Sequence, residues 1–337
     1  MKIHIPHTDI VVNNKKKLFV LTRPFFIDGK WSETICSISE AEVVLLPFSI
    51  NYYFDNKKEK LLKIINAQCL QYRIKVYGYI AGDFGQAYPE FSNIIYFRMG
   101  GFKKQLSDKN KGFPVSLSDH FQRLYQIENP IPKEKSQLPI VGFCGHATLG
   151  QAKRAKETVK FVIENAKRFF KNPFRNDWEP LFASAYERAK LLSSLEKSSL
   201  IATNFIYRKN YRAGAQTEVE REKTTLEYYD NIANSDYVVC VRGAGNFSVR
   251  LYETLMMGKI PVFVDTDCLL PFEDEIDWKK HLVWIEWKNR KQIAQKIIDF
   301  HNSISNQEFI DLQISNRKLW KETLSVNGML SMIKCKL

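Results

Sequence analysis

The most informative part of the chain is residues 236–278, which read DYVVCVRGAGNFSVRLYETLMMGKIPVFVDTDCLLPFEDEIDW. The apolar run at 236–241 predicts a buried strand, and residues 248–257 carry the apolar spacing of a helix. A second apolar run at 260–264 follows Gly258, a residue type that commonly ends a helix. The stretch therefore predicts a strand, a glycine turn, a helix and a second strand, which is the repeating unit of a parallel sheet.

The predicted turn carries groups that suit an anion. We expect Gly243 and Gly245 to adopt positive φ and to let the backbone pass close to a bound group. Ser248 can cap the helix that follows and leave its first N–H groups directed at the turn. A helix N-terminus beside the carboxyl end of a strand favours anions. Arg242, just before the turn, and Arg250, in the helix, add positive charge beside it.

Arg250 and Glu253 lie three residues apart and therefore share one face of the predicted helix. Together with Arg242, Arg250 suits a diphosphate, and a carboxylate one turn further along suits the two vicinal hydroxyls of a ribose. The same spacing also fits a surface ion pair with no ligand, worth roughly a few tenths of a kcal/mol. Spacing alone leaves both interpretations open.

The same alternation of short apolar runs and longer amphipathic stretches covers the whole chain, which predicts an α/β fold with parallel sheets. Further strands are expected at residues 2–5, 18–21, 42–48, 74–79, 93–97, 139–145 and 199–207, and helices at 57–71, 151–170, 179–195, 217–234 and 289–324. Prolines at 114 and within 130–139 place a domain boundary there. We expect domains at 1–135 and 136–315, and a C-terminal helix at 316–337 that returns to the first domain.

Composition limits the class of protein. The 337 residues are 45% hydrophobic and 26% charged, which is typical of a globular protein and excludes a disordered or fibrous one. The 50 Lys and Arg against 37 Asp and Glu give a net charge of +13. Such a positive field attracts nucleic acid, phosphorylated small molecules or anionic lipid, and charge alone does not choose among them.

Cysteine usage and hydropathy predict a location. The 6 cysteines are scattered without CxxC spacing, which argues against a zinc site or a disulfide framework and fits a reducing compartment. The sequence MKIHIPHTDI at the N-terminus lacks the apolar core of a signal peptide. No stretch approaches the roughly 18 apolar residues of a membrane span. We therefore expect a soluble, cytoplasmic protein.

Residues 240–263, CVRGAGNFSVRLYETLMMGKIPVF, and residues 270–278, LPFEDEIDW, closely resemble the exostosin family of glycosyltransferases. The family signature reads Cys-Pro-Arg-Gly, a Ser-x-Arg-x-x-Glu-Ala-Leu helix, Gly-x-Ile-Pro-Val, and Leu-Pro-Phe followed by Asp-Trp. Weaker similarity extends to residues 41–48, 82–85 and 141–145. The departures are Val241 for the usual proline and Gly82 for the usual histidine.

The resemblance implies a GT-B fold, in which two Rossmann-like domains face each other across a cleft. It implies an inverting, metal-independent transfer of a sugar from a nucleotide-sugar, usually UDP-linked, to a hydroxyl of a glycan or lipid-linked oligosaccharide. Surface polysaccharide synthesis in a bacterial-type relative is the expected setting. The C-terminal domain would hold the donor, and the N-terminal domain the acceptor. The donor-binding residues that we expect are Arg208, Arg242, Gly243, Gly245, Ser248, Arg250, Glu253 and His146.

An inverting displacement needs a base for the acceptor hydroxyl. Asp83 matches the aspartate of a loop in the family and follows the strand predicted at 74–79, so we expect it to be catalytic together with Arg242. Asp83 could equally cap a turn, and His4 and His146 are rival bases. We expect no metal or other cofactor. The string Asp265-Thr266-Asp267 comes closest to a metal motif, although loop hydrogen bonding explains it as well.

Two further interpretations stay open. A catalytically silent, glycan-binding partner of another transferase would share the fold, although a silent copy has less need of a diphosphate site. A nucleic-acid-binding protein would fit the charge, but the basic residues are dispersed and no known binding motif accompanies them. Basic faces could instead bring the protein to an anionic membrane surface, at the inner face of the membrane, where a lipid-linked acceptor would lie.

Overall fold

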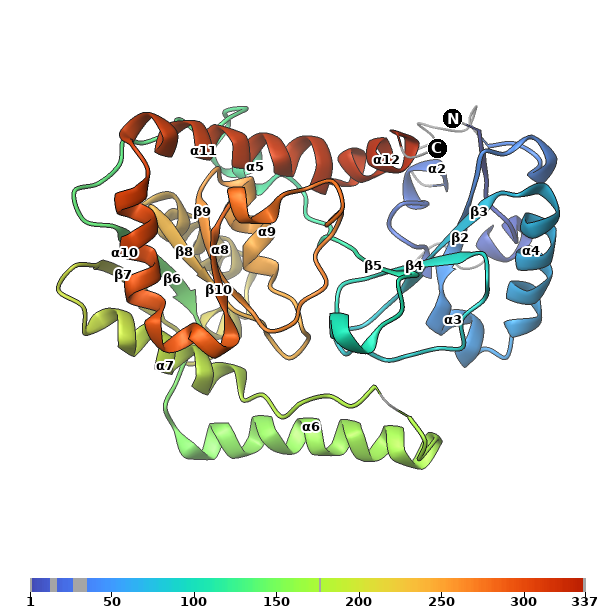
Figure 1. Ribbon diagram of the computed structural model, residues 1–337, viewed down its shortest axis with the longest axis horizontal. Coiled ribbons are helices and arrows are strands. Elements are labelled where there is room, and N and C mark those ends of the chain that lie inside the picture. Colours follow the sequence, from blue (N-terminus) through green and yellow to red (C-terminus); the bar gives the residue numbers. More distant parts are fainter. Residues whose placement is uncertain (1, 13–16, 27–34, 176, 336–337) are drawn as a thin grey trace. The chain divides into compact units, whose positions relative to one another are not determined.

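The computed structural model describes residues 2–12, 17–26, 35–175 and 177–335. The chain forms two compact units (Figure 1): unit 1 comprises Met1–Ser116, Leu269–Phe272 and Glu322–Leu337, and unit 2 comprises Leu117–Cys268 and Glu273–Lys321. Each unit contains a five-stranded sheet with helices around it. Every strand pair in both sheets is parallel. The predicted α/β class is confirmed, and two such units are what a GT-B fold requires.

Unit 1 has its strands in sequential order. They are β1 (Ile3–His4), β2 (Val43–Ser49), β3 (Lys75–Ile80), β4 (Ile94–Arg98) and β5 (Asn110–Gly112). The helices α3 (Ile50–Asp55) and α4 (Glu59–Tyr72) follow β2, and α4 buries Leu62, Ile65 and Cys69 in the core formed with β2 and β3. The remaining helices of the unit are α1 (Thr8–Val12), α2 (Arg23–Phe26) and α12 (Val326–Cys335).

The strand predicted at residues 18–21 is wrong. Leu18 makes only an isolated antiparallel bridge to Phe48. The chain then turns and enters α2, in which Pro24 takes the second position. Proline fixes φ near the helical value and lacks an N–H, so it suits the first turn of a helix better than a strand. Leu18 and Leu21 are nevertheless buried, as their apolar side chains predict.

Unit 2 has its strands in the order β10-β9-β8-β6-β7. They are β6 (Ile140–Gly145), β7 (Ala202–Tyr207), β8 (Tyr237–Cys240), β9 (Ile260–Asp265) and β10 (Val283–Glu286). The helices are α5 (His120–Tyr125), α6 (Gln151–Lys171), α7 (Ser184–Glu196), α8 (Glu218–Ala233), α9 (Val249–Met256), α10 (Ile293–Ser303) and α11 (Asn306–Leu319). No helix in the described part of the chain has the length and apolarity of a membrane span.

The strand order of unit 2 creates a topological switch point. From β6 the chain first runs outward to β7 on one side, and then returns to place β8 on the other side of β6. Helices that connect the two directions leave the sheet on opposite faces, so a crevice opens at the carboxyl ends of the two neighbouring strands. In this chain those ends are Gly145 and Cys240. Ligands of open α/β sheets bind at such a crevice.

Two features at the ends of the elements agree with their sequence signals. Thr217 and Glu220 form a reciprocal capping box at the start of α8. At the end of α9, Gly258 has φ +64°, and the N–H of Lys259 donates to the carbonyl of Thr254 at 2.9 Å, which completes a Schellman motif. The predicted helix stop at Gly258 is therefore confirmed.

The boundary between the units lies earlier than residue 135. Residues 117–135 pack on unit 2, where the Arg317 guanidinium of α11 donates to the Asp119 carboxylate at 2.6 Å. The Gln313 side chain exchanges two hydrogen bonds with the backbone of Lys133. The prolines of this segment therefore belong to an extended strap held by side chains of α11. Residues Glu322–Leu337 are part of unit 1.

Candidate functional site

Arg250, from the first turn of α9, lies across the switch point of unit 2. Its Nη2 donates to the carbonyl of Cys144 at the end of β6 at 2.9 Å, and its Nη1 lies 3.5 Å from the carbonyl of Val239 in β8. The guanidinium also stacks over the Phe143 ring, 4.3 Å from the centroid. A Cβ at Gly145 would come within 2.9 Å of Nη2, so a side chain here would force the guanidinium to shift.

Three more groups gather on the same short segment after β6. Arg188, from α7, donates through Nη1 to the carbonyl of His146 at 3.0 Å. The backbone N–H of Arg208 donates to the carbonyl of Gly145 at 2.9 Å, and the His146 ring bonds through Nδ1 to the carbonyl of Arg208 at 2.9 Å. Arg188, Arg208, Arg250 and His146 therefore surround one strand end.

These side chains carry hydrogen-bonding atoms that nothing in the described protein satisfies. The Nε atoms of Arg188, Arg208 and Arg250 and the Nε2 atom of His146 are buried, and none has a partner among the described residues. A buried donor that makes no hydrogen bond costs about 1–3 kcal/mol of folding free energy. Native structures rarely leave several such groups together, so the cluster indicates a ligand or ordered water whose oxygens accept from the three arginine Nε–H groups.

The electrostatics of the cluster also favour an anion. Burial and, to a smaller extent, the positive charge of Arg250 lower the pKa of Arg188 to about 10, against the opposing effects of Glu157 and Tyr228. Arg208 has a carboxylate partner, Glu227, at 2.6 Å. The two guanidiniums of Arg188 and Arg250 thus repel each other, while Glu157 favours the charged form of Arg188 and Glu253 that of Arg250. A doubly charged group such as a diphosphate would relieve that repulsion.

Glu253 lies one turn after Arg250 and is held by two tyrosines of α8. Its carboxylate accepts hydrogen bonds from the hydroxyls of Tyr228 and Tyr229, the latter at 3.4 Å. Burial raises the pKa of the Glu253 carboxyl, while the Tyr228 hydrogen bond and the Arg250 charge oppose that effect. The Tyr228 ring also lies 5.7 Å from the Arg250 guanidinium. Tyr228 thus contacts both Arg250 and Glu253, and this pair lies in a partly buried site and not on an open surface.

Arg242 is enclosed by protein side chains. Its side chain is 1% exposed and lies between the Phe182 and Phe161 rings, 3.9 Å from the equally buried carboxylate of Glu179. Its Nη2 also donates to the carbonyl of Ala244 at 2.8 Å. A guanidinium enclosed in this way stabilises the turn after β8, and its place in the donor site stays a prediction. The sequence could not show this enclosure, because the enclosing residues lie far away in the chain.

The glycine turn itself also differs from the prediction. Among the described glycines those with positive φ do not include Gly243 or Gly245, so neither needs to be glycine for its backbone conformation. A Cβ at Gly243 would meet nothing within 4 Å, which leaves open space beside it. Ser248 occupies the N-cap of α9, but its side chain makes no capping hydrogen bond. The turn is therefore set by other residues.

Asn246 is one such residue, and the sequence did not single it out. Its amide donates to the carbonyls of Thr266 at 3.2 Å and Asp267 at 2.9 Å, and it accepts from the Thr266 hydroxyl at 2.6 Å. Asp265 accepts from the N–H of Cys268 at 2.9 Å. The Asp265–Asp267 string thus carries loop hydrogen bonds. In the described residues no three His, Cys, Asp or Glu side chains gather as a metal site.

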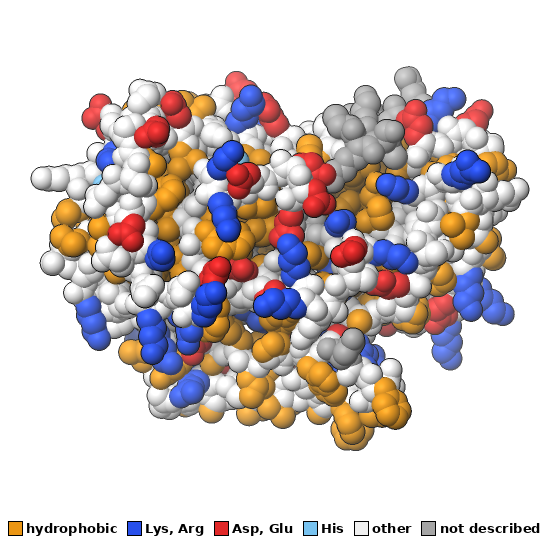
Figure 2. Space-filling model, in the orientation of Figure 1, with side chains coloured by type: hydrophobic (Ala, Val, Ile, Leu, Met, Phe, Trp, Pro, Cys, Tyr) orange, Lys and Arg blue, Asp and Glu red, His pale blue; other side chains and the backbone are white. Residues whose placement is uncertain are grey.

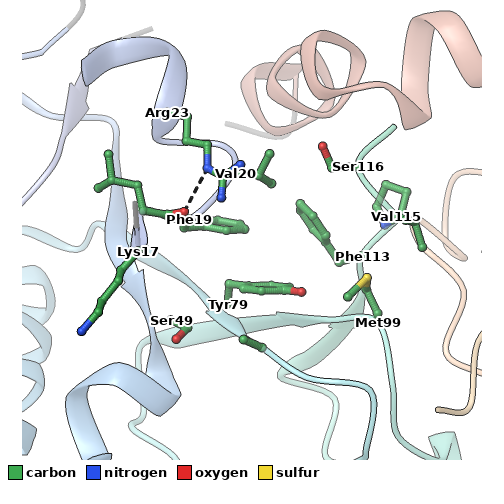
Figure 3. Close-up of a pocket in the computed structure, with 13 residues that line it drawn as sticks. Lys17, Phe19, Val20, Arg23, Ser49, Tyr79, Met99, Phe113, Val115 and Ser116 are labelled. Atoms are coloured by element: carbon green, nitrogen blue, oxygen red, sulfur yellow. Dashed lines mark hydrogen bonds between the residues drawn. The ribbon is translucent and has the colours of Figure 1, made fainter. Parts of the chain in front are cut away.

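Unit 1 contains a pocket of about 420 Å³ at the carboxyl ends of β2, β3 and β4 (Figure 3). Its centre is a group of aromatic rings. Phe19 stacks on Tyr79 at 5.0 Å between centroids, and both lie 5.4 Å from Phe113. The other lining residues are Lys17, Leu18, Val20, Arg23, Ser49, Ala81, Met99, Pro114, Val115 and Ser116.

Asp83 belongs to the loop at the same edge of that sheet. It is exposed, two residues after Ala81 of the pocket lining, and its charge adds to the effect of burial that raises the pKa of Tyr79 to about 12. The backbone of Asp83 rests on Gly100, where a Cβ would lie 2.2 Å from the Asp83 carbonyl oxygen. His4, the rival base in unit 1, bonds through Nδ1 to the carbonyl of Cys36 at 3.0 Å.

Comparison with solved structures finds glycosyltransferases at low similarity. The crystal structure of TarM matches with a TM-score of 0.37 and 12% identity, over 90% of this chain and 55% of that one. A glycosyltransferase from Rickettsia africae ESF-5 matches with a TM-score of 0.36 and 12% identity, over 98% of this chain and 95% of that one.

Sequence comparison finds exostosins and related plant enzymes. Exostosin-1 of Drosophila melanogaster is 30% identical over 104 residues, which are 31% of this chain and 13% of that protein. A probable glucuronosyltransferase 47 A of Physcomitrium patens is 34% identical over 86 residues, 26% of this chain and 18% of that protein. The chain thus matches less than a fifth of the length of either relative.

A family model matches a longer stretch of the chain than these relatives do. The model for the Exostosin GT47 domain matches residues 114–299. That range contains β6 to β10, the glycine turn and the cluster around the end of β6, and it covers more than half of the 337 residues. The resemblance of residues 240–278 to the exostosin signature is confirmed, and the chain belongs to the Exostosin GT47 family.

Proposed function

We propose that the chain is an inverting glycosyltransferase that moves a sugar from a UDP-linked donor to a hydroxyl of a glycan or lipid-linked oligosaccharide. Family membership supports transfer of a sugar, and unit 2 is our choice for the donor site. The observation that carries this choice is the group of buried, unpartnered Nε atoms of Arg188, Arg208 and Arg250 around the end of β6. A diphosphate supplies both the acceptor oxygens and the negative charge that these groups lack.

The proposed donor site differs in part from the one expected from the sequence. Arg250 remains the central phosphate ligand, Arg208 and His146 remain beside it, and Arg188 replaces Arg242. The His146 Nδ1 donates to a carbonyl in the neutral ring, so its Nε2 becomes a donor only when the ring is protonated.

Glu253 stays our choice for the ribose hydroxyls. Both of its oxygens accept from tyrosine hydroxyls in the free protein, with Tyr228 and Tyr229 as donors. Two vicinal sugar hydroxyls can replace these donors one for one, so ribose binding would keep the buried carboxylate satisfied. The exchange would release the tyrosine hydroxyls to accept or donate elsewhere in the site.

In the proposed reaction an acceptor hydroxyl oxygen attacks the anomeric carbon as the bond from that carbon to the diphosphate oxygen breaks. The configuration inverts, and the hydroxyl proton passes to the Asp83 carboxylate. The negative charge that develops on the leaving diphosphate is stabilised by Arg188, Arg208 and Arg250. Such preorganised donors are typically worth about 2.7–4 kcal/mol each in the transition state. These cations supply the charge that a metal ion supplies in other transferases, so we propose a metal-independent reaction.

We further propose that the pocket of unit 1 holds one sugar ring of the acceptor. The rings of Phe19, Tyr79 and Phe113 pack against one another and form an apolar wall of the pocket, which suits the apolar face of a sugar ring. Asp83 follows the pocket residue Ala81 by two positions in the chain, and its charge raises the pKa of Tyr79, another pocket residue. This assignment needs the two units to face each other as in a GT-B fold, with the protein in the cytoplasm where nucleotide-sugars are made.

A thermal-shift panel with UDP, other nucleoside diphosphates, UDP-sugars and uridine tests the proposal, since a ligand that binds the folded state raises stability by mass action. We expect UDP and at least one UDP-sugar to raise Tm, and uridine to do so far less. If no nucleotide raises Tm, the donor site is wrong. If UDP-sugars bind but purified protein transfers no sugar to any glycan, the non-catalytic partner is favoured instead.

A further inference from the structure

The helix α6 of unit 2 divides into three faces along its whole length. The face that packs on the protein carries Phe161 and Arg168, which are 2% and 3% exposed. Both acidic residues of the helix belong to this inner face. Glu157 accepts from the N–H of Ala185 at 3.0 Å, and Glu164 pairs with Arg168 at 3.1 Å. Neither carboxylate is among the exposed side chains of α6, since Glu157 and Glu164 are both partly buried.

The second face is apolar and open to solvent. Val159, Val162, Ile163, Phe169 and Phe170 repeat at the spacing of one helix face and are 52%, 51%, 50%, 48% and 84% exposed. The segment that follows continues the apolar surface with Phe174, Trp178 and Leu181, which are 94%, 36% and 59% exposed. Figure 2 shows hydrophobic side chains gathered along the edge of the molecule formed by α6.

The third face is a row of lysines beside the apolar face. Lys153, Lys156, Lys160, Lys167 and Lys171 follow one another at intervals of three, four, seven and four residues, so they line one side of the helix. No ion pair in the described part of the chain involves any of them. A strip of five ammonium groups thus runs parallel to a strip of exposed aliphatic and aromatic side chains.

We propose that these two faces of α6, with the side chains of Phe174, Trp178 and Leu181, form a docking surface for an anionic lipid bilayer. An amphipathic helix with lysines on its polar face and aromatic residues on the other lies in the plane of a membrane interface. The apolar side chains enter the region between headgroups and acyl chains, and the lysines remain at the level of the lipid phosphates. Soluble monomeric proteins rarely leave such large apolar side chains open without a partner.

The chemistry of the surface distinguishes a bilayer from other partners. Two copies of the chain that met through α6 would bring the lysine rows together, and like charges would repel. A nucleic acid would neutralise the lysines but would leave Phe170 and Phe174, at 84% and 94% exposure, in water. A bilayer with acidic headgroups satisfies both strips at once. This inference goes beyond sugar transfer and does not depend on the proposed donor site.

Vesicle flotation of the full-length protein tests the inference. We expect wild type to float with vesicles of phosphatidylcholine and phosphatidylglycerol and to bind pure phosphatidylcholine far less. The double variant F170S/F174S loses two exposed aromatic side chains, so its partition coefficient should fall at least about tenfold. K160E/K167E should fall at least about 25-fold, because each lysine near an anionic surface contributes about fivefold.

Matched controls replace the same residue types elsewhere on unit 2. V219S/I314S removes apolar side chains that are 76% and 53% exposed on α8 and α11, and K291E/K296E reverses two exposed lysines. Both should float like wild type. The inference is overturned if the wild-type protein stays in the bottom fraction and does not float with anionic vesicles. It is also overturned if the control variants and the α6 variants lose binding equally. Dimerisation without vesicles that F170S/F174S abolishes would show that a second copy occupies the face.

Discussion

The Arg188 and Arg250 guanidiniums meet at the end of β6, where Arg188 donates to the carbonyl of His146 and Arg250 to that of Cys144. Burial and the Arg250 charge lower the pKa of Arg188 to about 10. The protein therefore holds two like charges together at a cost to its own stability. Such an arrangement is useful where an anion binds, because binding energy replaces the repulsion.

Replacement of Arg188 should affect the Tm of the free protein and its affinity for UDP in different ways. We expect Arg188→Gln to leave the Tm of the free protein unchanged or higher, since it removes a buried charge beside Arg250. Its affinity for UDP should fall at least about tenfold, because a hydrogen bond to a charged group contributes about 1.5–3 kcal/mol. Calorimetric titration with UDP measures the effect. Lys190→Gln, on the exposed side of α7, should bind like wild type, and equal affinity of the two variants would contradict the role of Arg188.

Gly145 offers a second, independent test of the same site. A methyl group at this position would lie 2.9 Å from Nη2 of Arg250, so Gly145→Ala should displace the guanidinium and weaken UDP binding. Gly243→Ala adds the same methyl group where nothing lies within 4 Å and should leave unfolding of the free protein unchanged. Thermal melts with and without UDP measure both variants. A Gly145→Ala protein with the wild-type shift by UDP would exclude Arg250 as a phosphate ligand.

The sequence predicted the buried strands of unit 2 well and its site only in part. The strands at 236–241 and 260–264 were found because each is a continuous apolar run, as a strand covered on both faces must be. β10 was missed: it is a four-residue edge strand in which Trp284 and Glu286 are not buried, whereas the other edge strand, β7, was predicted although none of its residues is buried. No motif marks Arg188, which reaches the end of β6 only because α7 packs there.

Arg242 shows the limit of argument by resemblance. A motif identifies which residue types recur, but whether a side chain points to a ligand or into the protein depends on its neighbours. Here those neighbours are Phe161, Phe182 and Glu179, none of which lies near residue 242 in the sequence. Arg242→Met should therefore act mainly on stability. Unfolding in urea is the measurement, and a loss of UDP affinity without a loss of stability would restore Arg242 to the donor site.

Asp83 is expected to act in the chemical step alone. Asp83→Asn keeps the shape of the side chain but removes the base, so sugar transfer should fall by about 10²–10⁴-fold while UDP binding is unchanged. Asp55→Asn, an exposed carboxylate at the end of α3, is the matched control and should transfer normally. Transfer assays with saturating donor, combined with UDP titration, separate the two effects. Unchanged transfer by Asp83→Asn would assign the base to another group.

Buried Lys259 predicts a pH dependence of the free energy of unfolding. Its side chain is 5% exposed, and burial, with a further effect of Lys133, lowers its pKa from 10.5 to about 8. Below pH 8 the buried ammonium is charged in both states and destabilises the folded one. Between about pH 8 and 10.5 the unfolded chain binds more protons than the folded one, so this penalty declines as pH rises.

Lys259→Met should therefore be more stable than wild type at pH 7, by at most about 3 kcal/mol for a shift of this size. The difference should shrink as the pH rises from about 8 and vanish near 10.5, because wild type then loses the buried charge. Urea unfolding of both proteins at several pH values measures it. Lys296→Met, an exposed lysine on α10, should show no such trend. A stability gain for Lys259→Met that stays constant across this range would show that the pKa of Lys259 is the same in the folded and the unfolded protein.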